Sequence, residues 1–193
     1  MKEIVFASNN PNKLKEIELL LPSNFFIKGL SSIGCTEEIP ETQATIEGNA
    51  LQKANYIYDK YQVNCFADDT GLEVNALNGR PGVYSARYAG EEKNAQNNMK
   101  KILTELSGNK NREALFKTVV ALIWQGKQYL FEGIVTGVIT EKMSGTAGFG
   151  YDPIFMPSGF ARTFAEMNMQ EKNQISHRAR AVAKLVDFLK TVS

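Results

Sequence analysis

The sequence has little histidine and cysteine, with one His and two Cys among its 193 residues. Cys35 and Cys65 lie far apart in apolar surroundings. They are too few for a disulfide framework, and they lack the close pairing of cysteines that structural zinc sites use. We therefore expect two reduced thiols. A Ser-His or Cys-His triad would have to use His177, which belongs to a basic segment, so no convincing triad can be assembled.

Neither sign of charge dominates, because 22 Lys and Arg stand against 21 Asp and Glu. A nucleic-acid binder normally carries a basic excess on one face, so this balance argues against such a partner. The longest aliphatic stretch, residues 119–124, is too short to cross a bilayer. The opening MKEIVFASNN is too short for the apolar part of a signal peptide. We expect a soluble, cytoplasmic protein that does not bind membranes.

The composition is that of an ordinary globular protein, with 43% hydrophobic and 22% charged residues. The length fits one domain, since domains usually have about 100–200 residues. No internal repeat, low-complexity tract or linker-like segment divides the sequence. We predict a single domain over residues 1–193.

Strands and helices alternate early in the chain, and a hairpin comes late. Asn10 followed by Pro11 is typical of a helix start, with an N-cap and then a proline in the first turn. The last segment repeats its apolar residues at helical spacing, with Ala183 on the inward face. This order predicts an α/β fold with a mixed sheet flanked by helices. The predicted elements are strands over 3–7, 63–67, 72–74, 114–124 and 129–140, and helices from Pro11, from about Thr45, over 93–106 and over 176–190.

Lys13 is expected in the first turn of the first helix, where a cation opposes the helix dipole at a cost of about 0.3–1 kcal/mol. An anion would remove this conflict, because the amides at a helix N-terminus already favour phosphate. The polar turn Ser8-Asn9-Asn10 supplies further donors. The segment therefore predicts a phosphate site, and the alternative is a surface lysine in water.

Asp68 and Asp69 follow the apolar run Cys65-Phe66-Ala67, so we expect them at the end of a strand. Side chains of neighbouring strand residues point to opposite faces, so one carboxylate can face a cleft while the other is held by backbone or side-chain donors. Carboxylate oxygens suit Mg²⁺, which keeps several waters and leans on substrate phosphates. The alternative is an Asp-Asp-Thr-Gly turn whose carboxylates cap backbone amides.

Two further charged residues flank the second helix. Glu41 lies in an acidic loop before the helix, and Lys53 lies beside its apolar face. Lys53 can extend along the core and place its charge in a cleft. Solvated surface charges are the alternative for both residues.

The segment GTAGFGYDPIF, residues 145–155, combines three glycines with aromatic residues. Glycine permits close approach of a ligand to the backbone, and a flat base stacks on an aromatic ring with about 1–3 kcal/mol. Phe149 and Tyr151 are the candidate stacking residues. Asp152 precedes a proline, which favours extended geometry and fixes the direction of its carboxylate. The alternative is a Gly-rich turn with core aromatics.

A basic cluster surrounds the only histidine. If Ser176 is an N-cap, His177 and Arg178 occupy the first turn of the last helix, which repeats the anomaly at Lys13. Lys172 lies four residues before Ser176. These three donors can bind keto oxygens or a phosphate, and a structural histidine is the alternative.

Five stretches together resemble the inosine/xanthosine triphosphate pyrophosphatases, also called non-canonical purine NTP pyrophosphatases. They run from near the start of the sequence almost to its end, and the combination of DDTGLEV, PGVYSARYAG, GFGYDPIF and ISHR is highly specific. The stretches are SNNPNKLKEI at 8–17, ETQATIEGNALQKA at 41–54, FADDTGLEVNALNGRPGVYSARYAG at 66–90, GFGYDPIF at 148–155 with TFAEM at 163–167, and KNQISHRARA at 172–181.

The resemblance implies an elongated α/β fold of two lobes around a long mixed sheet with a central cleft, and a homodimer. It also implies a role for each matched position. Glu41 and Asp69 match the family's magnesium ligands. Asp69 also matches its general base, and Asp68 matches the neighbour that supports it. Lys13 and Lys53 match the lysines that contact phosphate. The implied substrate contacts are Ser8, Asn9, Asn10, Pro11, Asn12, Lys13, Lys53, Thr70, Phe149, Gly150, Tyr151, Asp152, Lys172, His177 and Arg178.

Four positions depart from the family pattern. Ser8 replaces threonine and Thr70 replaces serine, so both hydroxyls remain. Ile46 replaces a common phenylalanine. Gln43 replaces a common glycine, which alters the turn after Glu41 and weakens the assignment of that residue.

The resemblance predicts Mg²⁺-dependent hydrolysis of ITP, dITP and XTP to the monophosphate and pyrophosphate, with ATP and GTP as poor substrates. Two alternatives remain. One is a septum-inhibitor-type pyrophosphatase acting on other modified nucleotides, against which ISHR and GFGYDPIF argue. The other is a non-catalytic nucleotide sensor, against which the paired aspartates and the two lysines argue.

Overall fold

The computed structural model describes residues 2–21 and 24–192. The chain forms two compact units. Unit 1 contains residues 1–69, 118–133 and 178–193, and unit 2 contains residues 70–117 and 134–177. In the described part of the chain, no helix has the length and apolar character needed to cross a membrane.

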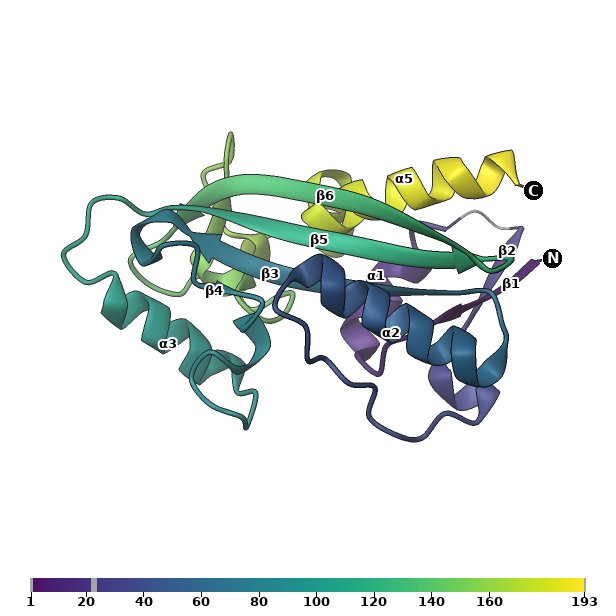
Figure 1. Cartoon of the computed structure of the whole chain (residues 1–193). Coiled ribbons are helices and arrows are strands. Elements are labelled where there is room, and N and C mark those ends of the chain that lie inside the picture. Colours follow the sequence, from purple (N-terminus) through teal and green to yellow (C-terminus); the bar gives the residue numbers. More distant parts are fainter. Residues whose placement is uncertain (1, 22–23, 193) are drawn as a thin grey trace. The chain divides into compact units, whose positions relative to one another are not determined.

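The strands form a seven-stranded mixed sheet in the order β2-β1-β3-β5-β6-β7, with β4 paired to β3 (Figure 1). β1 runs parallel to β2 and β3, whereas β4 is antiparallel to β3 and β7 is antiparallel to β6. The predicted α/β class with a mixed sheet is therefore confirmed. The strands are β1 (Lys2–Phe6), β2 (Phe25–Lys28), β3 (Cys65–Val74), β4 (Pro81–Gly82), β5 (Glu113–Trp124), β6 (Lys127–Ile139) and β7 (Phe155–Pro157).

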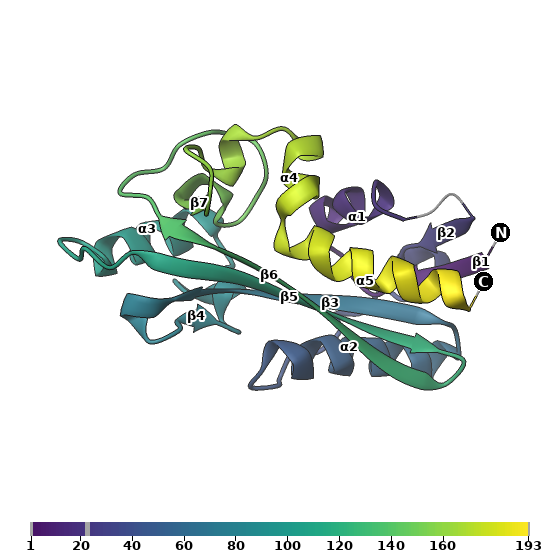
Figure 2. The same ribbon diagram turned by 90° about the horizontal axis from the view of Figure 1, so that it is seen from above.

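Unit 1 packs helices on both faces of its strands. Successive strand side chains point to opposite faces, and two separate apolar clusters result. One joins Val5, Cys65 and Ala67 to α2 (Ile46–Tyr61). The other joins Ile4, Phe6 and Phe66 to α1 (Pro11–Glu18) and α5 (His177–Thr191). Figure 2 shows α2 on one side of the strands and α1 with α5 on the other.

Unit 2 has a single apolar cluster, built from its parts of β3, β5 and β6 together with α3 (Ala95–Glu105) and the segment before α5. That segment contains the 3-10 helices η4 (Asp152–Ile154) and η5 (Phe164–Glu166) and the short helix α4 (Met169–Ile175). Three phenylalanines, Phe116, Phe155 and Phe164, stack or tilt against one another in the core.

Most predicted elements are confirmed within one or two residues. Asn10 caps α1 by accepting from the amides of Asn12 and Lys13. Thr45 caps α2. Gln125 and Gly126, both with positive φ, form the tight turn between β5 and β6, as expected for a two-residue hairpin loop. The strands β2, β4 and β7 and the helix α4 were not predicted from the sequence.

Three expectations were wrong. β3 does not end at Asp68 but continues to Val74, because its pairing passes from β1 to β4 along its length. Ala183 is exposed, since the buried face of α5 follows Ala181, Val182, Leu185 and Leu189. Asp152 does not adopt an extended conformation but begins η4.

Candidate functional site: a charged cluster and an aromatic cluster

The N-terminus of α1 presents a polar turn. Ser8 Oγ accepts from the amide of Asn10 at 3.2 Å, and Asn10 Oδ1 accepts from the amides of Asn12 and Lys13 at 3.0 and 3.3 Å. Asn9, Pro11 and Asn12 are exposed. The side chains of this turn thus shape the loop and leave its outer residues open to a ligand.

Lys13 extends from this turn to Asp68, with Nζ 2.9 Å from Oδ1. The other carboxylate oxygen of Asp68 accepts from Arg178 Nε at 3.1 Å. Arg178 also pairs with Glu16, which lies one turn after Lys13 on α1. Glu16, Asp68 and Arg178 are almost completely buried. The four side chains form a continuous chain of alternating charge inside unit 1.

The electrostatics of this chain favour an ionised Asp68. Burial alone would raise the pKa of the Asp68 carboxyl, but Lys13 and Arg178 outweigh it and hold that pKa well below its usual range. Burial lowers the pKa of Lys13, and Asp68 opposes this shift. Asp68 is therefore an anion held by two cations, and its charge opposes the loss of the proton from the partly buried Lys13.

Asp69 points to the opposite face of β3, towards α2. Lys53 Nζ donates to Asp69 Oδ1 at 3.1 Å and to Glu41 Oε1 at 2.6 Å. Asn49 Nδ2 lies 3.4 Å from Asp69 Oδ2. The expectation that the two adjacent aspartates face opposite sides is confirmed, and Glu41 and Asp69 converge on one ammonium group.

The ionisation of Asp69 differs from that of its neighbour. Burial raises the pKa of Asp69, and Lys53 and Lys13 only partly oppose it, while Glu41 adds to the rise. The pKa of Lys53 is raised, because Asp69 and Glu41 outweigh the effect of burial. Asp69 is thus the aspartate that takes up a proton more readily.

Glu41 and Asp69 fit a divalent cation that has few protein ligands. Among residues 2–21 and 24–192, no group of three or more His, Cys, Asp and Glu side chains is placed to hold a metal. Mg²⁺ needs only one or two carboxylates when waters and phosphate oxygens complete its shell. Its hard-oxygen preference matches these two side chains. The net charge of the ion-paired side chains also suits a cation, because three positive groups stand against four negative ones. The positive groups are Lys13, Lys53 and Arg178, and the negative groups are Glu16, Glu41, Asp68 and Asp69.

The second cluster lies in unit 2 around Phe149. Asp152 Oδ2 accepts from the Phe149 amide at 2.8 Å and from Lys172 Nζ at 2.7 Å. This first bond closes the turn and is the reason why Asp152 is not extended. Lys172 Nζ lies 4.8 Å from the centre of the half-buried Phe149 ring, within range of a cation–π contact. One lysine is therefore fixed beside one partly open aromatic ring.

His177 is buried beside this cluster. Its ring stacks on Phe116 with centroids 4.5 Å apart, and it lies 6.3 Å from Phe164. Lys172 Nζ lies 5.6 Å from the same Phe164 ring. Lys172 and His177 thus both lie near the Phe164 ring, whereas Arg178 begins the stretch of unit 1 that contains the charged cluster.

The remaining predicted residues are placed as follows. Tyr151 packs in the core, and its hydroxyl donates to the carbonyl of Ser85 at 2.7 Å. Gly150 has a φ of +63° and open space where a side chain would start. Thr70 is half-buried on β3. Of the two aromatic candidates, Phe149 is therefore the more open one.

Sequence reasoning missed Glu16, Asn49, Phe116 and Phe164. Glu16 reads as a surface acid on an amphipathic helix, and only its spacing three residues after Lys13 places it on the same face. Asn49 is four residues before Lys53, and that spacing identifies it in the same way. The two phenylalanines lie in apolar segments where nothing in the sequence separates them from other core residues.

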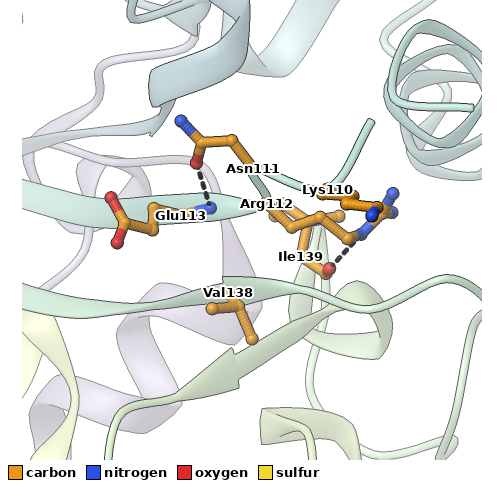
Figure 3. A pocket seen from close by; sticks show the side chains of 6 residues that line it. All are labelled: Lys110, Asn111, Arg112, Glu113, Val138 and Ile139. Carbon is orange, nitrogen blue, oxygen red and sulfur yellow. Dashed lines mark hydrogen bonds between the residues drawn. The ribbon is translucent and has the colours of Figure 1, made fainter. Parts of the chain in front are cut away.

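A separate hollow in unit 2 contains none of the predicted site residues. It has a volume of about 550 Å³ and is lined by Lys110, Asn111, Arg112, Glu113, Val138 and Ile139 (Figure 3). In this hollow, the guanidinium group of Arg112 donates to the backbone carbonyls of Leu106, Ile139 and Thr140. Arg112 therefore fastens β5 to the end of β6.

Comparisons with known proteins agree over the whole chain. The model of the Ham1 family matches residues 4–188. A dITP/XTP pyrophosphatase from Flavobacterium johnsoniae is 59% identical over 97% of both chains, and one from Bacillus subtilis is 47% identical over 98% of both. The solved structure of the Staphylococcus aureus Ham1 protein, 39% identical, covers both chains completely with a TM-score of 0.91. The chain therefore belongs to the Ham1 family.

Proposed function

We propose that this chain is a Mg²⁺-dependent pyrophosphohydrolase that converts ITP, dITP and XTP to the nucleoside monophosphate and pyrophosphate. The observation that carries the proposal is the pairing of a partly buried and a buried lysine with two adjacent aspartates, Lys13 with Asp68 and Lys53 with Asp69. Family membership and the names of the relatives support it. Hydrolase chemistry on a polyphosphate needs fixed cations, and a carboxylate to take a proton.

Glu41 and Asp69 are the residues that would hold Mg²⁺. When bound, the ion supplies positive charge to the phosphate oxygens and offsets the excess anion of the cluster. Lys13 and the first amides of α1 bind phosphate oxygens, since a helix N-terminus favours anions. Lys53 offsets the negative charge that develops on the leaving pyrophosphate.

Asp69 orients a water molecule for attack on the α-phosphorus. The water oxygen forms the new bond to phosphorus, the bond to the bridging oxygen breaks, and pyrophosphate leaves with that oxygen. The proton of the water passes to Asp69. Asp69 has one cationic partner, Lys53, whereas Asp68 is held by both Lys13 and Arg178. Of the two aspartates, Asp69 is therefore the one available to take a proton.

The aromatic cluster of unit 2 is the proposed base site. Phe149 offers a partly open ring for stacking, and Lys172 and His177 supply donors for a 6-keto group. These donors face no acceptor when the 6-position carries an amino group, and such mismatches discriminate by about 10⁴-fold or more. We propose that adenine is rejected in this way, and that Arg178 acts through Asp68. A homodimer and a cytoplasmic location belong to the same proposal.

Pyrophosphate release from ITP, XTP, dUTP, ATP and GTP, with and without Mg²⁺, tests the proposal. We expect release from ITP and XTP only with Mg²⁺. A septum-inhibitor-type activity predicts release from dUTP, and a sensor predicts binding of ITP without release. Asp69→Asn should lower kcat by about 10²–10⁴-fold, the usual contribution of a general base. Near-normal turnover in this variant would refute its role.

A further inference from the structure

Three side chains of α2 bind three consecutive residues of the loop that carries Glu41. As the chain runs forward along α2, the loop partner moves backward from residue 43 to residue 41. Asn49 Oδ1 accepts from the amide of Gln43 at 2.9 Å. Gln52 Oε1 accepts from the amide of Thr42 at 2.9 Å, and Gln52 Nε2 donates to Thr42 Oγ1 at 2.8 Å. Lys53 Nζ pairs with Glu41, as described above.

The spacing explains why one helix face makes all three contacts. Residues 49, 52 and 53 are related by three and four positions, so their side chains project from the same face. Three consecutive loop residues, 41 to 43, each have one partner on that face. The loop has no regular structure of its own, and residues 42 to 45 are exposed.

Gly48 allows the loop to approach this closely. A Cβ at position 48 would lie 2.8 Å from Cβ of Gln43 and 3.0 Å from Oγ1 of Thr45. Gln43, where the family usually has glycine, therefore packs over a glycine of the helix instead.

We propose that Gln52 is a positioning residue for the metal site: by holding both the amide and the hydroxyl of Thr42, it fixes the adjacent Glu41 in place before a divalent cation binds. The proposal rests on the assignment of Glu41 and Asp69 as metal ligands. A carboxylate on an unrestrained loop must lose backbone freedom when it binds an ion, and this loss weakens binding. Gln52 itself acts through Thr42 and is not a ligand of the metal or the substrate.

Binding of Mn²⁺ alone, followed through the EPR signal of free Mn²⁺, tests the proposal without substrate. Gln52→Ala should raise the Kd for Mn²⁺ about tenfold, the effect typical of removing a residue that supports a metal ligand. Thr42→Val, which removes the hydroxyl partner, should act in the same direction. Gln52→Ala removes both hydrogen bonds to Thr42, whereas Thr42→Val removes only the one to the hydroxyl. The double variant should therefore bind Mn²⁺ no more weakly than Gln52→Ala alone. In turnover, the concentration of Mg²⁺ at half-maximal rate should rise more than kcat falls.

Gln128→Ala is the matched control. Gln128 Nε2 also donates to a side chain of α2, Asn55 Oδ1, at 2.8 Å, but it does not touch the loop. We expect an unchanged Kd for Mn²⁺ in this variant and a thermal midpoint close to that of Gln52→Ala. Equal metal affinities in Gln52→Ala and the native chain, with weakened binding in Glu41→Gln, would overturn the positioning role alone. Unchanged binding in Glu41→Gln would instead overturn the metal assignment in the proposed function, and this inference with it.

Discussion

Replacing each of the two adjacent aspartates with asparagine should separate stability from activity. Asp68 is paired with Lys13 at 2.9 Å and with Arg178 at 3.1 Å, and its side chain has no exposed surface. Removing one partner of a buried ion pair costs about 3–5 kcal/mol. Lys13 is 15% exposed and Arg178 keeps Glu16, so we expect the lower end, about 3 kcal/mol.

Asp69→Asn should cost much less stability. Lys53 keeps its contact of 2.6 Å to Glu41, and the raised pKa of Asp69 shows that its charged form is not favoured by the fold. We expect a loss below about 1 kcal/mol, the scale of one hydrogen bond. Turnover should nevertheless fall far more in Asp69→Asn than the loss of stability explains.

Urea unfolding provides the assay. Trp124, the only tryptophan, is buried in the apolar cluster between the strands of unit 1 and α1 and α5, so its fluorescence reports on the unit that contains both aspartates. In a thermal melt followed by the same fluorescence, a loss of about 3 kcal/mol corresponds to a fall of about 6–12 °C in Tm for a chain of this size. Equal stability losses in the two variants, or a loss below about 1 kcal/mol in Asp68→Asn, would refute the reasoning.

The ion pairs of Asp68 also predict that stability depends on pH. The folded-state pKa of Asp68 lies below its ordinary value of 3.8. Its stabilisation is therefore complete above that value and is lost as the pH falls towards the folded-state pKa. The difference in unfolding free energy between the native chain and Asp68→Asn should be constant near neutral pH and should narrow below about pH 4.

Two further predictions concern residues outside the charged cluster. Gly145→Ala should destabilise the chain by more than about 2 kcal/mol, because φ is +82° and the new Cβ would lie 2.3 Å from the backbone of Ala165. Gly150→Ala places its Cβ in open space and should cost only about 1 kcal/mol. Thermal melts measure both losses, and equal losses in the two variants would contradict this prediction. Neither thiol should react rapidly with a disulfide reagent at pH 8 in the native state, since both cysteines are buried and burial raises the pKa of Cys65 to about 12. Both thiols should react in denaturant. A fast reaction of the native chain would contradict the burial of the two cysteines.

The sequence predicted the elements whose local rules are strong. The Asn10-Pro11 pair and Thr45 both cap helices where expected. Ala183 was misplaced because the face of α5 is set by buried Arg178 and by contacts with strands far away in the sequence. β2 was missed because four residues carry too little periodicity to show a strand.

For the site, the sequence identified the residue types better than their partners. Lys13 was singled out by its conflict with the helix dipole, and Asp68 and Asp69 by their place after an apolar run. Lys53 was identified by its position beside the apolar face of its helix. Their pairing, Lys13 with Asp68 and Lys53 with Asp69, depends on which face of β3 each aspartate occupies. Glu16 was invisible because a charged helix residue is normally solvated, and only the fold shows that Arg178 reaches it.

Hydrolysis of ITP in water enriched in ¹⁸O, with mass analysis of both products, tests the central claim most directly. Attack on the α-phosphorus, with Asp69 taking the proton, predicts one ¹⁸O in IMP and none in pyrophosphate. Label in pyrophosphate, or products that are IDP and inorganic phosphate, would contradict the proposed reaction.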